Sequence, residues 1–274
     1  MIKADKPTTA NNLQYHTHTG EDDIAPLCLI VGAPGRADMI AEKYLISSKR
    51  FSNDKRGLVS CTGYYKGVRV SVTTSGMGGA STGIILPEVA KSGARVIIRV
   101  GTCGSMIEKS KPGDSIIVTS AIRYDGASEN WAPIPFPANA DYRVVYALVE
   151  AAKKIAPDTH HVGEECTTSC FYAGQGRPNI YGEIPYWMSE RHEQVMKMGT
   201  ACYSMEAATL FTWGKYEARG IPTGAINAVV ANRHTNEFAV EGEEQAALIA
   251  LEALVWLSTD PDTLATIKKI EIPY

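Results

Sequence analysis

The run Phe171-Tyr172-Ala173-Gly174-Gln175-Gly176-Arg177 places a side-chain amide and a guanidinium two residues apart in a glycine-containing loop. Gln offers a donor and an acceptor on one planar group, whereas Arg offers only donors in a rigid fork. Together they match a planar ligand with an imide edge, such as uracil. A guanidinium would also stabilise a base that leaves with negative charge. Taken alone, the run is equally consistent with surface loop residues beside aromatic core anchors.

Three arginines could bind an anion. Arg36 follows a Gly-x-x-Gly turn, Arg56 lies in a polar stretch, and Arg99 lies inside an apolar run. A permanent charge in a buried strand needs an anionic partner, and no acidic residue stands near Arg99 in the sequence. We therefore favour a bound phosphate, helped by Thr102 and by glycine-rich turns, over a salt bridge to a remote carboxylate. No Walker A or Rossmann fingerprint is present, so no nucleotide cofactor is implied.

Glu206 stands at the beginning of an apolar helix predicted over 204–215. A carboxylate that adjoins a binding site there can accept hydrogen bonds from both hydroxyls of a ribose. The alternative is a glutamate that only complements the helix dipole. The residues around Glu206 do not favour one interpretation over the other.

Short apolar runs that end in glycine alternate with helical stretches and must position these groups. The pattern predicts strands at 27–32, 68–74, 95–100, 115–120 and 225–231, and helices at 80–91, 204–215 and 243–258. This alternation predicts an α/β fold with a central mixed, mostly parallel twisted sheet flanked by helices. Ligands collect beyond the carboxyl ends of such strands, where the glycines lie. With no linker or repeat, we expect a single domain over 1–274, with 1–14 as a loose N-terminal arm.

Composition excludes several classes of function. The 274 residues are 45% hydrophobic and 21% charged, with a net charge of −3 and no basic run, so no nucleic-acid partner is expected. A polar N-terminus and the absence of a long apolar run predict a cytoplasmic chain with no membrane partner. Six cysteines lack metal-ligand spacing and the adjacent histidines at 160–161 fall in a polar stretch. We therefore expect no metal site and buried thiols in a reducing compartment.

Five motifs, in order, resemble the nucleoside phosphorylase family, which includes purine and uridine enzymes. They are Gly-x-Pro-x-Arg at 32–36, Ser-Gly-Met-Gly-Gly-x-Ser at 75–81, Arg-x-Gly-Thr-x-Gly at 99–104, Arg-x-Asp-Gly-Ala-Ser at 123–128 and Met-Glu-x-Ala-Thr at 205–209. The resemblance runs from about residue 15 to 252. Within the family, Phe-Tyr-x-Gly-Gln-x-Arg resembles the uridine branch. The pair Asn232-Arg233 also resembles that branch, where the purine branch has Ser-Asp.

The resemblance implies a partly barrel-like sheet and reversible phosphorolysis of uridine to uracil and ribose-1-phosphate, with phosphate as co-substrate and no cofactor. Among the residues it implies, Arg99, Gln175, Arg177 and Glu206 would be catalytic. Phosphate would be held by Gly32, Arg36, Arg99 and Thr102, with Arg56 from a neighbouring subunit. Ribose would be held by Met205, Glu206 and His16, with His18 as the competitor of His16. The base would be framed by Gly104, Phe171, Gln175, Arg177 and Arg233.

A site completed by a neighbour implies a homo-oligomer, with a dimer as the minimal unit and the hexamer of bacterial relatives as the alternative. Three positions depart from the bacterial uridine pattern. Ala33 replaces an Asp, Ser204 replaces a Glu, and Gly57 replaces an acidic residue that helps to bind an intersubunit potassium ion. Three rival functions stay open: a purine nucleoside phosphorylase, a nucleosidase that uses water, and a non-catalytic nucleoside-binding protein on the same fold.

Overall fold

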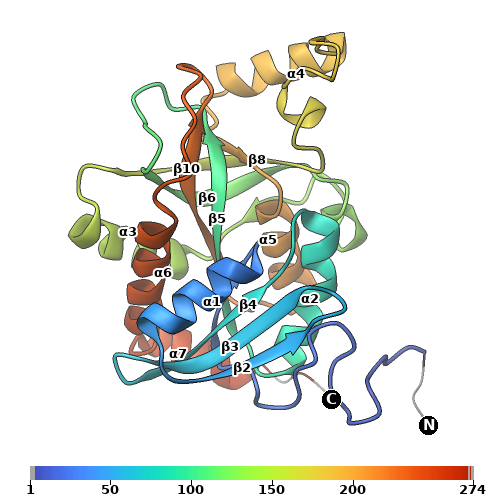
Figure 1. Cartoon of the computed structure of the whole chain (residues 1–274), viewed down its shortest axis with the longest axis vertical. Coiled ribbons are helices and arrows are strands. Elements are labelled where there is room, and N and C mark those ends of the chain that lie inside the picture. Colours follow the sequence, from blue (N-terminus) through green and yellow to red (C-terminus); the bar gives the residue numbers. More distant parts are fainter. Residues whose placement is uncertain (1–3, 271, 273–274) are drawn as a thin grey trace.

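The apolar run before Gly32 forms a strand that is buried on both faces and separates two hydrophobic cores. The computed structural model describes residues 4–270 and 272, and Figure 1 shows the arrangement of its helices and strands. Successive side chains of this strand point to opposite faces. Leu29 packs in one core and Ile30 in the other. A strand covered on both faces explains the continuous apolar run, in which no polar residue alternates.

The described residues contain ten strands, and their chain order differs from their order in the sheet. They are β1 (Leu27–Val31), β2 (Ile46–Asn53), β3 (Leu58–Tyr65), β4 (Val68–Thr74), β5 (Val96–Ser105), β6 (Ser115–Tyr124), β7 (Ala138–Asn139), β8 (His160–Thr168), β9 (Cys202–Ser204) and β10 (Thr223–Asn232).

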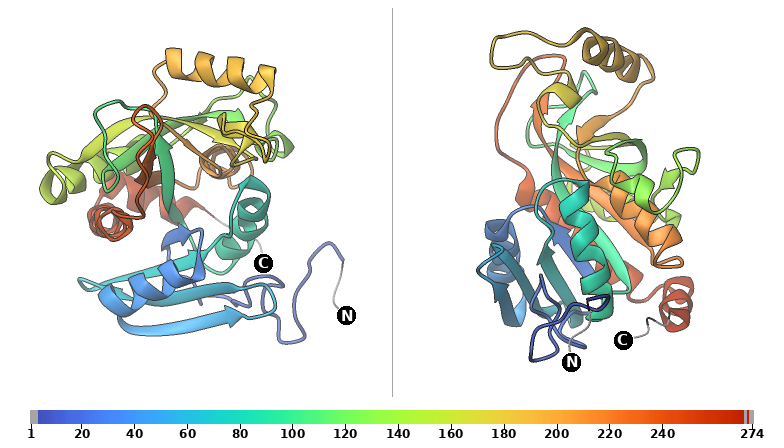
Figure 2. Two further views of the ribbon diagram at one scale, coloured as in Figure 1. Left: turned by 45° about the horizontal axis from the view of Figure 1, so that its top comes forward. Right: turned by 90° about the vertical axis from the view of Figure 1, so that its right-hand side faces the viewer.

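Seven α-helices and two short 3-10 helices complete the described chain. They are α1 (Pro34–Tyr44), α2 (Gly79–Lys91), η1 (Ser128–Asn130), α3 (Tyr142–Ile155), η2 (Ala173–Gln175), α4 (Tyr186–Lys197), α5 (Ala207–Tyr216), α6 (Glu243–Leu257) and α7 (Pro261–Lys269). Helices α1, α3 and α6 supply one core, while α2 and α5 supply the other. Helix α4 stands apart, at the end of the molecule opposite β2 and β3 (Figure 2).

The sheet is mixed and partly closed, as expected. Strands β5, β10, β6, β8 and β9 pair in a ring, because β10 bonds to both β5 and β6 while β9 bonds to both β8 and β5. Strands β1 and β4 extend the sheet from β5 in parallel, and the antiparallel strands β3 and β2 follow. The α/β class and the barrel-like part of the sheet are therefore confirmed.

Several predicted boundaries differ from the structure. Strand β5 continues through the glycine motif to Ser105, because its second half pairs with β10 and β9. The helix predicted from Ser204 begins at Ala207, because Cys202–Ser204 pair with β5 and β8 as β9. The polar stretch that begins with the histidines at 160–161, for which no strand was predicted, contributes most of β8 (His160–Thr168). Its polar side chains obscure the strand pattern.

The N-terminal segment lies beside β2 and β3 in both views of Figure 2. Within the predicted arm, residues 1–3 lie outside the described residues, as do 271 and 273–274 of the predicted domain. From residue 4 onward the arm has local order, including a bridge between Thr8 and Gln14. Five of the six cysteines are buried, and Cys170 is exposed. None of the helices described here is long and apolar enough to cross a membrane.

Candidate active site

The candidate site lies where the parallel strands β1, β4 and β5 run side by side. Val31, the last residue of β1, pairs with Thr74 of β4 and Val100 of β5. The turns after β1 and β4 therefore meet. A Cβ added to Gly32 would lie 3.7 Å from the Gly76 carbonyl oxygen. This edge brings together motifs that are far apart in the sequence.

Arg99 is buried on β5 with 4% of its surface exposed, and its guanidinium folds back over Gly101. A Cβ at Gly101 would lie 1.6 Å from Arg99 Nη1, so any larger residue would displace the guanidinium. Nη1 donates to Asn227 Oδ1 at 2.8 Å, and Nη2 forms an ion pair with Glu206. The strand pairing supports this geometry, because Asn227 lies opposite Gly101.

The anionic partner predicted for Arg99 is therefore present as a remote carboxylate, the alternative that the sequence interpretation favoured less. The pairing leaves part of the guanidinium unsatisfied. Arg99 Nε is buried and has no hydrogen-bond partner among the described residues. Buried polar groups are rarely left in that condition.

Glu206 occupies the N-cap position of α5 and is the acceptor of a converging set of donors. The Gly78 N–H donates to its Oε1 at 2.7 Å, and the Met205 N–H and Ser204 Oγ contact Oε2 at 3.2 and 3.3 Å. Gly78 has a φ of +85°, a conformation that glycine adopts at low cost. The carboxylate is thus fixed beside Arg99 by backbone groups from two motifs.

Arg36 lies on the first turn of α1, which begins with proline directly after the β1 turn. Its Nη1 donates to the Val100 carbonyl oxygen at 3.2 Å, and its Nη2 forms an ion pair with Glu243 of α6. Arg36 Nε, like that of Arg99, is buried without a partner in the described part of the chain. Thr102 is half-buried on the neighbouring strand β5.

The base-binding residues predicted from the opening motif converge in and after η2. Gln175 is 2% exposed, and its Oε1 accepts from Arg177 Nη1 at 2.5 Å. The same nitrogen donates to the Phe171 carbonyl oxygen at 2.7 Å, and the Arg177 Cζ lies 3.9 Å from the centre of the Phe171 ring. The amide, guanidinium and aromatic ring therefore form one contiguous cluster.

Arg233 joins this cluster from the end of β10. A Cβ at Gly104 would lie 3.4 Å from Arg233 Cδ and 3.5 Å from Arg177 Nη2, so both cations border Gly104. Burial, followed by the charge of Arg233, lowers the pKa of Arg177 to about 10. Burial likewise lowers the pKa of His192, which faces this region from α4, and the nearby cations lower it further. This end of the site is cationic.

The two residues of the Asn232-Arg233 pair have different surroundings. Asn232 is buried, and its Nδ2 donates to the Ser110 carbonyl oxygen at 2.7 Å. Its Oδ1 accepts from the backbone N–H groups of His234 and Thr235. Asn232 therefore holds two loops together, whereas Arg233 borders Gly104 beside Arg177.

Two predicted residues are not joined to this cluster within one chain. Arg56 is exposed in the β2–β3 turn, and its Cζ lies 5.7 Å from the centre of the Tyr15 ring. Over residues 4–270, no hydrogen bond or ion pair links Arg56 to the residues that surround Arg36 and Arg99. His16 is held by Glu88 of α2, with 2.7 Å between Nδ1 and Oε1. His18, its competitor, is half-buried and has a φ of +54°.

The three departures have local structural settings. Ala33 is the N-cap of α1 and provides no side-chain cap, which an Asp could have supplied. Ser204 donates to Glu206, as described above. Gly57 adopts a φ of +63° in the β2–β3 turn, a conformation that favours glycine over an acidic residue.

Sequence reasoning missed two residues that bond to predicted ones, and a third that bonds to one of these two. Glu243 partners Arg36, Asn227 partners Arg99, and the fully buried Glu165 bonds to Asn227 Nδ2 at 3.0 Å. Glu243 begins a predicted helix and Asn227 interrupts an apolar run. These were the available signals. The polar surroundings of Glu165 gave none.

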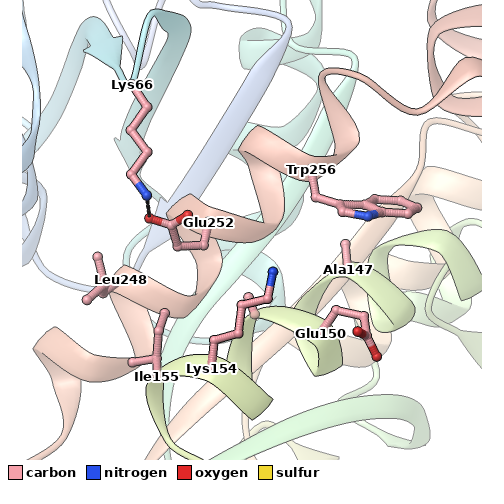
Figure 3. Close-up of a pocket in the computed structure, with 9 residues that line it drawn as sticks. Lys66, Ala147, Glu150, Lys154, Ile155, Leu248, Glu252 and Trp256 are labelled. Carbon is pink, nitrogen blue, oxygen red and sulfur yellow. Dashed lines mark ion pairs between the residues drawn. The ribbon is translucent and has the colours of Figure 1, made fainter.

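A cavity of about 290 Å³ lies elsewhere, between α3 and α6 (Figure 3). Lys66 forms an ion pair with Glu252 there, and the Trp256 ring borders the space. None of the predicted site residues lines this cavity. Within the described residues, no three His, Cys, Asp or Glu side chains are grouped so that they could hold a metal ion.

Comparison with known proteins gives consistent matches over most of the chain. A family model described as the phosphorylase superfamily matches residues 26–255. The chain is 38% identical over 254 residues to a uridine phosphorylase of Thermococcus kodakarensis, covering 93% of this chain and 90% of the relative. It is 34% identical over 252 residues to the uridine phosphorylase of Escherichia coli K12, covering 87% of this chain and 96% of the relative. A guanosine phosphorylase of Halorubrum lacusprofundi is 28% identical over 222 residues, covering 80% of this chain and 83% of the relative.

Proposed function

The chain belongs to the phosphorylase superfamily, and we propose that it catalyses the reversible phosphorolysis of uridine to uracil and ribose-1-phosphate. The family and the relatives named uridine phosphorylases together support a pentosyltransferase that carries out nucleoside phosphorolysis. The choice of uridine is the finer step. Two relatives of at least 34% identity are named uridine phosphorylases, and they align with most of this chain.

The observation that carries the choice of base is the cationic cluster around Gln175. Arg177 donates to the Gln175 amide oxygen at 2.5 Å, which fixes the two groups relative to each other. Such a pair can hydrogen-bond the imide edge of uracil. Arg233 also borders Gly104, and its Nη1 is buried without a partner among the described residues. We assign Arg233 to support the O4 side of the base.

We assign Gly32, Arg36, Arg99 and Thr102 to phosphate. The unsatisfied Nε donors of Arg36 and Arg99 support this assignment, because an anion would supply their acceptor. We assign Met205 and Glu206 to the ribose, whose hydroxyls would donate to the carboxylate. Phosphate held in this way would serve as the nucleophile and as a counter-charge to an oxocarbenium-like sugar.

Bond cleavage would leave negative charge on the uracil. Gln175 and Arg177 would stabilise that anion more strongly in the transition state than in the ground state, and this difference accelerates a reaction. A uracil anion requires no general acid, and we assign none. No cofactor is needed for these steps, in which phosphate is a co-substrate.

We propose a homodimer as the smallest complete unit. Arg56 is exposed at a turn, where a neighbouring subunit could approach it, and it would then complete the phosphate site of that neighbour. His16, or else His18, would reach the 5′-hydroxyl across the same contact. Light scattering coupled to size-exclusion chromatography would separate a monomer, a dimer and a hexamer. A purely monomeric active enzyme would contradict the proposal.

The deciding experiment is an ultraviolet phosphorolysis assay with uridine, thymidine, inosine and guanosine, each with and without phosphate. Phosphate-dependent cleavage of uridine, with inosine and guanosine unchanged, is the expected result. Faster cleavage of a purine nucleoside would overturn the base assignment and favour the second candidate, which the guanosine phosphorylase relative supports. Cleavage without phosphate would indicate a nucleosidase. Binding without turnover would indicate a nucleoside-binding protein.

A further inference from the structure

Glu165 is a carboxylate at the centre of the fold to which the proposed mechanism gives no role. It lies on β8 with 0% of its surface exposed. Its Oε1 accepts from Thr167 Oγ1 at 2.7 Å and from the Ala207 N–H at 3.3 Å, and its Oε2 accepts from Asn227 Nδ2 at 3.0 Å. A fully buried carboxylate is costly unless several donors satisfy it, and here three do.

The contact with Asn227 determines what Arg99 meets. A side-chain amide presents an acceptor on one side and donors on the other. Glu165 requires the donor side of Asn227, so the acceptor side must face Arg99 Nη1, which donates to it at 2.8 Å. With the amide reversed, two sets of donors would face each other. Glu165 therefore acts on Arg99 through the orientation of Asn227.

The contact with Ala207 connects Glu165 to Glu206, the residue assigned to the ribose. Ala207 is the first residue of α5 and directly follows Glu206. A hydrogen bond from its N–H to Glu165 holds the backbone at the beginning of that helix. One buried carboxylate thus bonds both to Asn227, the hydrogen-bond partner of Arg99, and to the residue that follows Glu206. Arg99 and Glu206 are the two members of the buried ion pair.

Charge alone would give Glu165 a different effect. Burial raises the pKa of Glu165, Arg99 lowers it, and Glu206 raises it. An ionised Glu165 beside Arg99 would oppose a phosphate anion, so its removal would strengthen phosphate binding. Loss of orientation would weaken binding instead. The two effects have opposite signs, and an experiment can separate them.

We propose that Glu165 is a positioning residue that, through Asn227 and the Ala207 N–H, sets Arg99 and Glu206 in the arrangement that binds phosphate and ribose together. The proposal rests on the proposed function in assigning these two ligands to Arg99 and Glu206. It adds a residue that touches neither ligand.

The test compares Glu165→Gln with Glu164→Gln, the neighbouring exposed glutamate on the same strand. We expect Glu165→Gln to lower kcat/KM for uridine phosphorolysis by about 10- to 100-fold, because small misplacements of reacting groups have effects of this size. Titration calorimetry with inorganic phosphate should show weaker binding by about 10-fold for the same variant. Glu164→Gln should match the wild type in both measurements.

Two further measurements separate positioning from a merely structural role. Adding Asn227→Ala to Glu165→Gln should cause little further loss, because residues that act through one another are not additive. If Glu165→Gln does not fold, Asn227→Ala alone should show the same loss of phosphate affinity. Unchanged or tighter phosphate binding, or additive losses, would overturn the proposal.

Calorimetry also distinguishes this proposal from the proposed function. A wild-type protein that binds phosphate but does not cleave uridine would refute the substrate, while the phosphate comparison would still test Glu165. A wild-type protein that binds no phosphate would overturn both.

Discussion

The candidate site has a proposed phosphate end, with Arg36 and Arg99, and a proposed base end, with Arg177 and Arg233. The two ends differ in whether carboxylates neutralise their arginines. At the phosphate end, Arg99 pairs with Glu206 and Arg36 pairs with Glu243. At the base end, Arg177 donates to the Phe171 carbonyl and the Gln175 amide, and neither it nor Arg233 forms an ion pair with any described carboxylate. Both ends contain two arginines, so the difference lies in their partners.

This difference fits the charges that each end would meet. A buried ion pair holds its members in fixed positions, although its net contribution to stability is small. Such a pair suits groups that must bind two substrates in register. An uncompensated guanidinium is costly in the free protein, and the pKa of Arg177 is accordingly lowered to about 10. That cost would be relieved as negative charge develops on the leaving base.

The largest effect should follow from breaking the buried pair. Arg99→Ala leaves Glu206 buried without its counter-ion, so we expect a loss of about 3–5 kcal/mol in the free energy of unfolding. Phosphorolysis should be lost as well. Urea denaturation measures the first effect, and Arg50→Ala, which removes an exposed pair with Asp38, provides the control. A loss for Arg99→Ala no larger than that of the control would show that the pair does not hold this region together.

The base end should show the reverse balance of activity and stability. Arg177→Ala leaves no carboxylate without a partner, so we expect a loss of only about 1–2 kcal/mol from its hydrogen bonds. Its kcat should fall by about 10²–10³, with phosphate binding little changed. The control is Arg191→Ala, which removes a cation lying 4.7 Å from the centre of the Tyr124 ring. Near-normal uridine turnover in Arg177→Ala would remove this residue from the mechanism.

Much of the arrangement of the two ends, although not the partners of their arginines, could be predicted from the sequence because it lies in local patterns. Glycines at the ends of apolar runs indicated which strand ends meet, and the parallel pairing of β1 with β4 and β5 agrees. The base-end cluster is mostly contained in 171–177, so its members are neighbours in any fold. Glu206 also lies at the beginning of a helix, as expected, although α5 begins later than predicted.

The partners of the phosphate-end arginines could not be predicted, because they depend on register between distant segments. Asn227 reaches Arg99 only because β10 pairs with β5 so that Asn227 faces Gly101. Glu165 lies in a polar segment that resembles a loop, and only its pairing with β6 makes it a strand. A charged residue in a polar segment gives no sign that the fold will bury it.

A smaller effect should come from the more exposed pair at the phosphate end. Arg36 retains its bond to the Val100 carbonyl if Glu243 loses its charge, so the guanidinium should stay in place. Glu243→Gln then removes a negative charge that competes with phosphate. Partly exposed pairs contribute about 0.2–1 kcal/mol, so we expect the KM for phosphate to fall by about 1.4- to 5-fold.

The matched control for this variant is the next residue along the helix. Glu244 pairs with the exposed Lys43, and Glu244→Gln should leave the phosphate KM unchanged. A higher KM in Glu243→Gln would instead show that the ion pair, rather than the Val100 carbonyl, holds Arg36 in position. The phosphate end would then depend on its carboxylates even at its exposed edge.

The smallest expected effect is a dependence of stability on pH at the base end. His192 stacks on Tyr203 and lies near Arg177, Arg233 and His234, and both burial and these cations lower its pKa. As the pH falls below about 6.5, the unfolded chain takes up this proton before the folded chain does. Stability should therefore decrease as the pH falls through that window. In urea denaturation, the free energy of unfolding of His192→Gln should decrease less steeply than that of the wild type between pH 7.5 and 5.5. Above pH 7.5 the free energies of the two proteins should change with pH in parallel. Equal slopes below pH 6.5 would mean that neither burial nor the nearby cations lower the pKa of His192 in the folded protein.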